Sequence, residues 1–152
     1  MPRMFLNGTA MSGGADHHLV GGAELVARTT TAKRYRFHAV DGRYPGLEDV
    51  GEGGAAVEGE VYELSYEQLR EVLLPGEPAG LELGVIELAD GSGSLAMVLR
   101  REYPKLPPTE DISDLASWRT YREADSEGAS QLAPASEERT ERGGEPSARA
   151  GR

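Results

Sequence analysis

The amino-acid sequence predicts an α+β domain, built on a strongly curved mixed sheet or small barrel of five to six strands with two or three short helices. Short apolar or alternating segments bounded by Gly, Pro and Asp recur between residues 4 and 101, and such segments are typical of strands. Only two or three segments have the apolar spacing of a helix, and each is short. A chain of 152 residues suffices for one such domain.

The predicted strands are short and end at turn residues. The first, Met4–Leu6, is apolar and stops at Asn7-Gly8. A later run alternates in character, which is expected for a half-buried strand, with Arg34, Arg36 and His38 on the polar face. The opposite face carries Tyr35, Phe37 and Ala39, which are expected in the core. The six predicted strands are Met4–Leu6, Glu24–Thr31, Lys33–Val40, 57–64, Leu81–Leu88 and Ser94–Arg101.

Clusters of turn residues predict the connections between strands. Residues 41–56 contain Asp41-Gly42, Pro45-Gly46 and the run GEGG at 51–54, so this segment is predicted to be a connection without a strand. Asp90-Gly91-Ser92-Gly93 predicts a hairpin turn, because glycine readily takes the positive φ that tight hairpins need.

Helix signals occur in three places. Ser65 and Gln68 form the S-x-x-Q pattern of a capping box, and Pro75-Gly76 ends the helix that follows. Leu69, Val72 and Leu73 give this helix an apolar stripe. A last helix is predicted over Asp111–Arg122, capped by Asp111 or Ser113, with Leu115, Trp118 and Tyr121 or Arg122 on its stripe. Residues 17–20 are predicted to form one helical turn.

The folded domain is expected to cover residues 1–122, followed by a disordered tail over 123–152. Leu132 is the only Leu, Ile, Val or Phe in that stretch, so burial cannot offset the entropy of ordering it.

Charge and composition limit the partners. A net charge of −10 disfavours nucleic acid and anionic membrane surfaces, and no run of 18 apolar residues predicts a membrane span. Cysteine is absent, which fits a cytoplasmic protein. His17 and His18 are adjacent and point in different directions, and His38 is the only other histidine, so neither a metal site nor a cofactor is expected.

The loop after the first predicted strand is a candidate anion site. Asn7, Gly8, Thr9, Ala10 and Met11 can present consecutive backbone N–H groups to a carboxylate. The alternative is that the loop is only a turn. Glu58 and Glu60 share one face of a predicted strand and are expected to be solvated there, without forming a catalytic pair.

Four segments, in order, resemble the γ-glutamylcyclotransferase-like proteins, also called AIG2-like. They are Asn7–Met11, Tyr44-Pro45-Gly46-Leu47, GAAVEGEVYEL at 54–64, and Leu69–Glu77. Further segments are similar to the C-terminal module of allophanate hydrolase and its stand-alone relatives: KRYRFHAV at 33–40, GLELGVIEL at 80–88, Asp111-Ile112-Ser113 and Trp118–Tyr121. The likeness extends over residues 4–122.

This resemblance implies a small mixed barrel and a pocket between the loop and Glu77, where cyclotransferases use a glutamate as general acid and base. Burial beside Pro75, Gly76 and Pro78 could raise the pKa of Glu77, while the alternative is a solvated surface carboxylate. Two positions depart from the pattern. Asn7 replaces the aromatic residue that opens the cyclotransferase loop, and Ala10 replaces the histidine of the allophanate hydrolase loop.

The implied function is an enzyme or binding domain for a small carboxylate-bearing amide or ureido compound, with Glu77 as the catalytic residue and the loop as the substrate-binding element. The alternatives are a γ-glutamylcyclotransferase that releases 5-oxoproline, or a non-catalytic binding or assembly domain. The expected partners are a small-molecule carboxylate ligand and either a second copy of the chain or an amidase.

Overall fold

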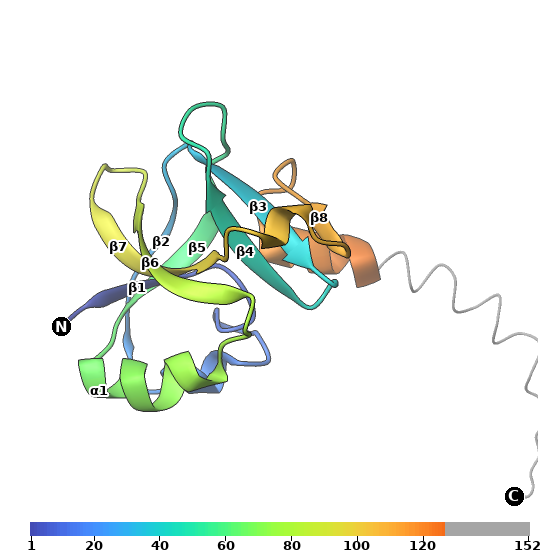
Figure 1. The fold of residues 1–152 in the computed structure, drawn as a ribbon. Coiled ribbons are helices and arrows are strands. Elements are labelled where there is room, and N and C mark those ends of the chain that lie inside the picture. Colours follow the sequence, from blue (N-terminus) through green and yellow to red (C-terminus); the bar gives the residue numbers. More distant parts are fainter. Residues whose placement is uncertain (127–152) are drawn as a thin grey trace, which may run out of the picture. The chain divides into compact units, whose positions relative to one another are not determined.

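The structure is a computed structural model that describes residues 1–126. It contains a compact unit, Met1–Trp118, and a second unit that begins at Arg119. Within the described residues, eight strands form one mixed sheet with the order β2-β5-β1-β7-β4-β3-β8, in which β6 pairs with β7 (Figure 1). The strands are β1 (Arg3–Leu6), β2 (Glu24–Thr30), β3 (Tyr35–Val40), β4 (Tyr44–Asp49), β5 (Glu58–Glu63), β6 (Leu81–Glu87), β7 (Gly93–Leu99) and β8 (Thr109–Asp111).

The central strand β7 changes its neighbour halfway along. Its first part pairs in parallel with β1, where Phe5 faces Ala96, and its second part pairs in parallel with β4, where Leu47 faces Val98. The other edge of β7 is paired along its whole length with β6. Met97 therefore lies between Ala96, the last residue of β7 that pairs with β1, and Val98, the residue that pairs with β4. The sheet splits at this point.

The sheet curls around an apolar core. Tyr35, Phe37 and Ala39 of β3 are buried in it, as predicted. The other large side chains that are fully enclosed include Met4, Phe5, Met11, Leu47, Leu64 and Leu73. The predicted α+β class with a small curved mixed sheet is confirmed, with more strands than the five or six expected.

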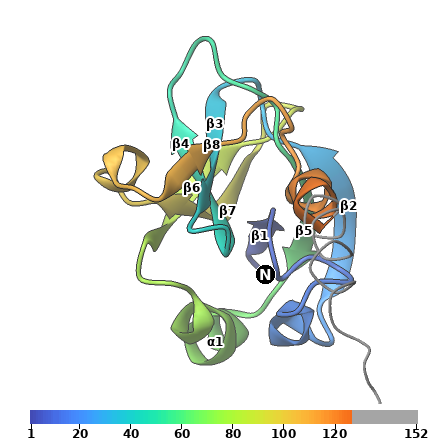
Figure 2. The same cartoon turned by 90° about the vertical axis from the view of Figure 1, so that its right-hand side faces the viewer.

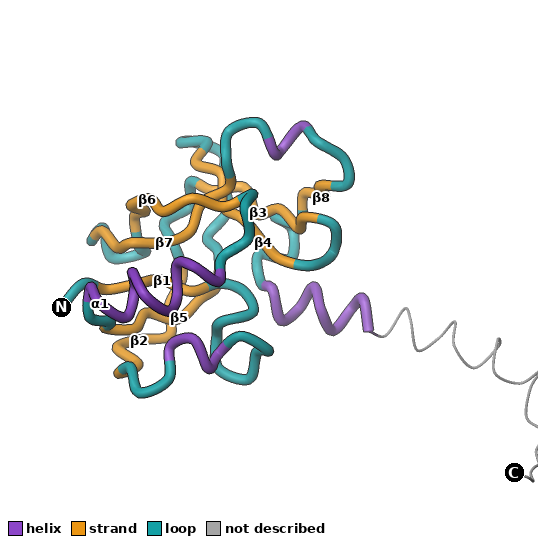
Figure 3. The backbone as a smooth tube through the Cα atoms, turned by 60° about the horizontal axis from the view of Figure 1, so that its bottom comes forward, coloured by secondary structure: helices purple, strands orange, loops and turns teal. Residues whose placement is uncertain are grey.

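One helical segment, residues 66–76, covers one side of the sheet. It begins as α1 (Tyr66–Gln68), continues through a π-helical turn (Leu69–Leu73) and ends in a 3₁₀ turn (Leu74–Gly76). Figure 2 shows α1 beside the 3₁₀ turn His17–Val20, both below β1 and β5, and Figure 3 shows the same segment as a continuous run of helix.

The start of this helical segment is largely as predicted. The Ser65 hydroxyl caps it by accepting a hydrogen bond from the Gln68 N–H at 3.0 Å. The Gln68 side chain does not reach back to complete a capping box, because its amide donates to the Gly21 carbonyl at 3.2 Å. Of the predicted stripe, Leu69 and Leu73 are buried, whereas Val72 is 42% exposed.

The strand β4 was not predicted, because Pro45-Gly46 has the signature of a turn. In the structure both residues lie inside the strand and pair with Ala39 and His38 of β3. Proline is tolerated there because β4 pairs with β7 only at Leu47, so Pro45 removes no ladder bond on that side. The short strand β8 was also missed.

Two residues expected on solvated faces are buried. His38 is 5% exposed, since β3 is paired on both edges, and its Nε2–H donates to Glu48 at 2.9 Å. Glu60 is 1% exposed, because β5 lies between β1 and β2 and the loop after β1 packs against it. The prediction of a solvated face holds for Glu58 and is wrong for Glu60.

The last predicted helix begins later than Asp111. Residue Asp111 ends β8, and its carboxylate accepts from both the N–H and the hydroxyl of Ser113 (2.9 and 2.6 Å). The Ser113 hydroxyl also accepts from the Phe37 N–H at 2.9 Å. Both predicted capping side chains are therefore used in a turn that attaches the chain to β3, and the helical residues are 118–126.

The predicted domain boundary after Arg122 falls inside this helix. Residues 127–152 of the predicted tail lie outside the described part of the chain. Over residues 1–126, no helix is both long enough and apolar enough to cross a lipid bilayer.

Candidate functional site

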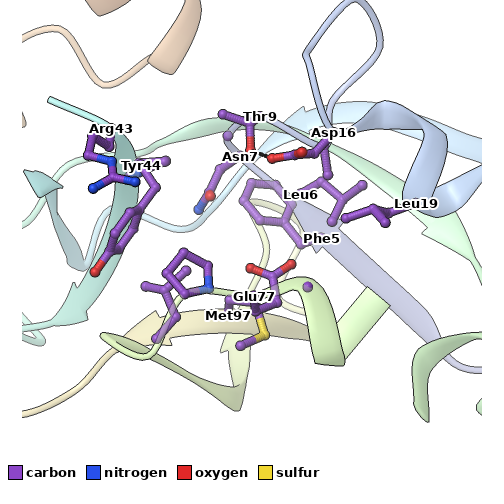
Figure 4. Close-up of a pocket in the computed structure, with 16 residues that line it drawn as sticks. Phe5, Leu6, Asn7, Thr9, Asp16, Leu19, Arg43, Tyr44, Glu77 and Met97 are labelled. Carbon is purple, nitrogen blue, oxygen red and sulfur yellow. Dashed lines mark hydrogen bonds between the residues drawn. The ribbon is translucent and has the colours of Figure 1, made fainter. Parts of the chain in front are cut away.

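A pocket of about 220 Å³ opens where β1 and β4 separate. Ligand sites for drug-sized molecules have volumes of roughly 300–1,000 Å³, so this pocket suits a small metabolite. Four segments of the chain form its walls (Figure 4). They are the end of β1 with its loop (Phe5–Ala10), the 3₁₀ turn region (Asp16 and Leu19), the start of β4 (Arg43–Pro45), and the residues after the helical segment (Gly76–Pro78), with Leu81 and Met97 completing the surface. We call it the Glu77 pocket.

The loop after β1, residues 7–14, has an unbalanced set of backbone groups. The four carbonyls of residues 8–11 each accept a hydrogen bond inside the loop region. In the described part of the chain, the N–H groups of Gly8, Thr9 and Ala10 donate to no other residue. Residues 8–10 therefore offer three backbone donors while each of their carbonyls already accepts a hydrogen bond, which favours an anion. The four bonds are Met11 N to Gly8 O (3.1 Å), Asp16 N to Thr9 O (2.9 Å), His17 Nδ1 to Ala10 O (3.0 Å) and Gly14 N to Met11 O (2.9 Å).

Four of the five predicted loop residues line the pocket. Asn7, Gly8, Thr9 and Ala10 do so, whereas the Met11 side chain is 2% exposed and packs in the core. The side-chain amide nitrogen of Asn7 is buried without a hydrogen-bond partner among residues 1–126. Figure 4 shows this amide directed toward the space between Tyr44 and Glu77.

Because an unpartnered buried donor costs free energy, we expect Asn7→Leu to leave the stability unchanged or to raise it, by up to about 1 kcal/mol. The isosteric leucine fills the same volume without a polar group. Thermal unfolding of the ligand-free protein measures the effect. A fall in melting temperature of several degrees would show that the Asn7 amide is a structural group.

Glu77 follows the helical segment and is half-buried in the pocket. Pro75 and Gly76 end the segment, and Gly76 packs near Leu19, where an added Cβ would lie 3.2 Å from the leucine Cδ1. The chain then becomes extended at Glu77, whose N–H donates to the Leu74 carbonyl at 3.1 Å. The structure thus brings Glu77 into the same pocket as Gly8, Thr9 and Ala10, as expected. Its catalytic role remains a prediction.

Burial, together with the smaller effect of the negative charge of Asp16, raises the pKa of Glu77 to about 7. At neutral pH this carboxyl is therefore divided between its protonated and ionised forms. A group in this state can both accept and donate a proton at physiological pH, which general acid–base catalysis requires.

Three further polar residues line the pocket and were not predicted. The Asp16 carboxylate accepts from the Thr9 hydroxyl at 2.7 Å, which fixes it beside the loop. Arg43 is exposed at the rim and supplies a positive charge. Burial raises the pKa of Tyr44, so its hydroxyl stays protonated at neutral pH. No local pattern marked Asp16 or Arg43, and the segment Tyr44–Leu47 carried the family resemblance without indicating a site. The pairing of β4 with β3 and β7 brings Arg43 and Tyr44 to the pocket.

The two adjacent histidines lie outside the pocket lining. His17 binds the Ala10 carbonyl from behind the loop, and His18 is exposed. Within residues 1–126, no three His, Asp or Glu side chains are grouped as a metal ion would require.

A larger groove of about 710 Å³ lies beside β6 and the helical segment. It is lined mainly by apolar side chains such as Leu69, Leu83 and Val85, and its ionisable members are Arg3, Arg70 and Tyr66. Among residues 1–126, no Asp, Glu or His side chain lines this groove.

Solved structures of other proteins identify the fold. An AIG2-like protein from Mus musculus is 21% identical with a TM-score of 0.56, over 70% of this chain and 84% of that one. The urea amidolyase of Kluyveromyces lactis is 22% identical with a TM-score of 0.76, over 81% of this chain and 8% of that one. The curled mixed sheet is thus the fold of the AIG2-like, γ-glutamylcyclotransferase-like proteins.

The family follows from the sequence itself. The family model of the allophanate hydrolase C-terminal domain matches residues 2–123, so the chain belongs to this family. A uropathogenic E. coli-specific protein is 33% identical with a TM-score of 0.74, over 80% of this chain and 94% of that one. No curated protein sequence matches the chain.

Proposed function

We propose that the protein binds a small carboxylate-bearing amide or ureido compound in the Glu77 pocket and transfers protons to and from it through Glu77. One observation carries the proposal: a carboxyl whose pKa is about 7 lines the same small pocket as a loop with three uncommitted backbone donors. The loop would hold the carboxylate of the substrate. Glu77 would then act on the neighbouring nitrogen as general base and general acid.

The arrangement supports amide or ureido chemistry because proton transfer to nitrogen is the step that such compounds need. Catalysis by Glu77 requires its carboxyl to change protonation during the reaction, and a pKa near 7 makes both forms available. Membership in the allophanate hydrolase C-terminal domain family supports a ureido compound of the allophanate type.

The cyclotransferase reaction is the second candidate, and Ala10 is the observation that favours it. Ala10 stands at the position of the histidine in the allophanate hydrolase loop. Its side chain is 8% exposed and has no group that can exchange a proton. Glu77 is then left as the acid and base of the pocket. A single glutamate suffices to move the proton of an attacking amine when a γ-glutamyl group cyclises to 5-oxoproline.

Incubation of the full-length protein with allophanate and with a panel of γ-glutamyl dipeptides tests the proposal. Release of CO₂ from allophanate supports the first candidate, and release of 5-oxoproline supports the second. Binding without turnover, with binding measured by calorimetry on the same compounds, would indicate a non-catalytic binding domain. If no compound binds or reacts, the proposed function is wrong.

A further inference from the structure

Glu60 is a buried carboxylate that contacts the loop from behind. It lies in β5, its side chain is 1% exposed, and it does not line the Glu77 pocket. Its two oxygens accept from the N–H of Ser12 at 2.8 Å, from the hydroxyl of Ser12 at 2.6 Å and from the hydroxyl of Tyr62 at 2.9 Å. Arg28 on the neighbouring strand β2 lies 3.4 Å away through its Nε.

A carboxylate at this position is costly unless its hydrogen bonds compensate for the lost solvation. Glu60 has two oxygens and at least three donors around it, and the Arg28 guanidinium balances its charge from an exposed position. An apolar residue would fill this position of β5, between β1 and β2, at lower cost. The hydrogen bonds of Glu60 are therefore suited to holding Ser12 in one position.

The same strand holds the loop at a second point. Tyr62, two residues along β5, contacts the His17 ring with the ring centroids 5.8 Å apart. His17 in turn donates through Nδ1 to the Ala10 carbonyl at 3.0 Å. The two attachments, at Ala10 and at Ser12, lie on either side of Met11, whose side chain is buried. The peptide groups of this turn are therefore held on the side away from the pocket.

We propose that Glu60 is a positioning residue: by binding the N–H and the hydroxyl of Ser12 it holds the loop so that the N–H groups of Gly8, Thr9 and Ala10 are left for a ligand. The role of Glu60 in holding the loop rests on the contacts above. What the loop then binds rests on the proposed function.

The test compares Glu60→Gln with Glu63→Gln, a control on the same strand whose carboxylate is partly exposed and lies 3.6 Å from the Arg3 Nε. Amide hydrogen exchange of the full chain is measured first, followed by ¹H–¹⁵N spectra during titration with sodium acetate, with sodium chloride as the ionic control. In Glu60→Gln we expect exchange of the hydrogen-bonded loop amides, those of Met11, Ser12 and Gly14, to be about tenfold faster than in the wild type. The acetate-induced shifts of the Thr9 and Ala10 amides should require about tenfold more acetate.

If Glu60→Gln fails to fold, Ser12→Ala and Tyr62→Phe provide the same test, because both residues donate a hydrogen bond to Glu60. Each removes one hydroxyl that Glu60 accepts from. Each should speed exchange of the Met11, Ser12 and Gly14 amides by a smaller factor, leaving β3 and β4 unchanged. Exchange in the loop that is as slow in all three variants as in Glu63→Gln overturns the inference. A wild-type protein that shows no acetate response, together with faster loop exchange in Glu60→Gln, contradicts the proposed anion site and supports the positioning role of Glu60.

Discussion

Replacing Glu77 by Gln is expected to lower turnover of the reactive compound by about 10²–10⁴-fold, with little change in its binding. The amide keeps the shape of the side chain and cannot exchange a proton. In the wild type, the dependence of kcat/KM on pH should show an inflection near 7, the pKa of Glu77, and this inflection should be absent from the variant. If Glu77→Gln turns over within about threefold of the wild-type rate, Glu77 takes no part in the reaction.

The same substitution has a second effect that requires no substrate. The pKa of Glu77 rises from 4.5 to about 7 on folding, so the folded protein holds the proton more tightly than the unfolded chain between these values. Stability contributed by this proton is fully present below about pH 4.5 and is lost as the pH rises through about 7. At pH 8 the wild type must bury a charge, which costs up to about 3 kcal/mol.

Glu77→Gln should therefore unfold at a higher denaturant concentration than wild type at pH 8, and at a similar one at pH 4.5. Glu71→Gln, at an exposed position in the helical segment, is the matched control and should show no such difference. Equal stability of Glu77→Gln and wild type at both pH values would mean that the pKa of Glu77 is close to its ordinary value.

Gly8→Val is expected to abolish ligand binding. The Pro45 ring packs against this glycine. A Cβ at Gly8 would lie 2.7 Å from the Cγ and Cδ atoms of Pro45, so any side chain must push β4 and the loop apart. Even Gly8→Ala should cost about 1–3 kcal/mol in stability.

Circular dichroism and acetate or substrate titration measure the two effects of Gly8→Val. Gly93→Ala is the control, because its added Cβ would lie 3.6 Å from the nearest atom, Cγ1 of Val85, an ordinary contact. A folded Gly8→Val variant with unchanged affinity would contradict the assignment of the loop as the anion site.

Local signals in the sequence predicted the parts of the fold that local interactions determine. The Ser65 cap, the Pro75-Gly76 stop and the alternation of β3 each depend on neighbouring residues. The structure has the cap and the stop, and the alternation of β3 holds from Tyr35 to Phe37 and fails at the buried His38. The placement of Glu77 follows from the first two, since a helix that buries Leu69 and Leu73 must return the chain beside the loop.

The missed features depend on contacts between distant residues. Pro45-Gly46 has the signature of a turn, and only pairing with β3 makes it a strand. The alternation of Glu58 and Glu60 indicates which side chains share a face, but it cannot show that the loop after β1 covers one of them. Asp16 and Arg43 reach the pocket through the same long-range arrangement.

The change of partner along β7 has a consequence for how the pocket can evolve. No ladder hydrogen bond joins β1 to β4 in the described chain, so the width of the gap between them is set by side chains, with Met97 at its base. A shorter or longer residue at this position would deepen or fill the pocket while the backbone pairing on both sides stayed intact. Substitution at Met97 therefore offers a family with this fold a way to change the size of its ligand without changing its sheet.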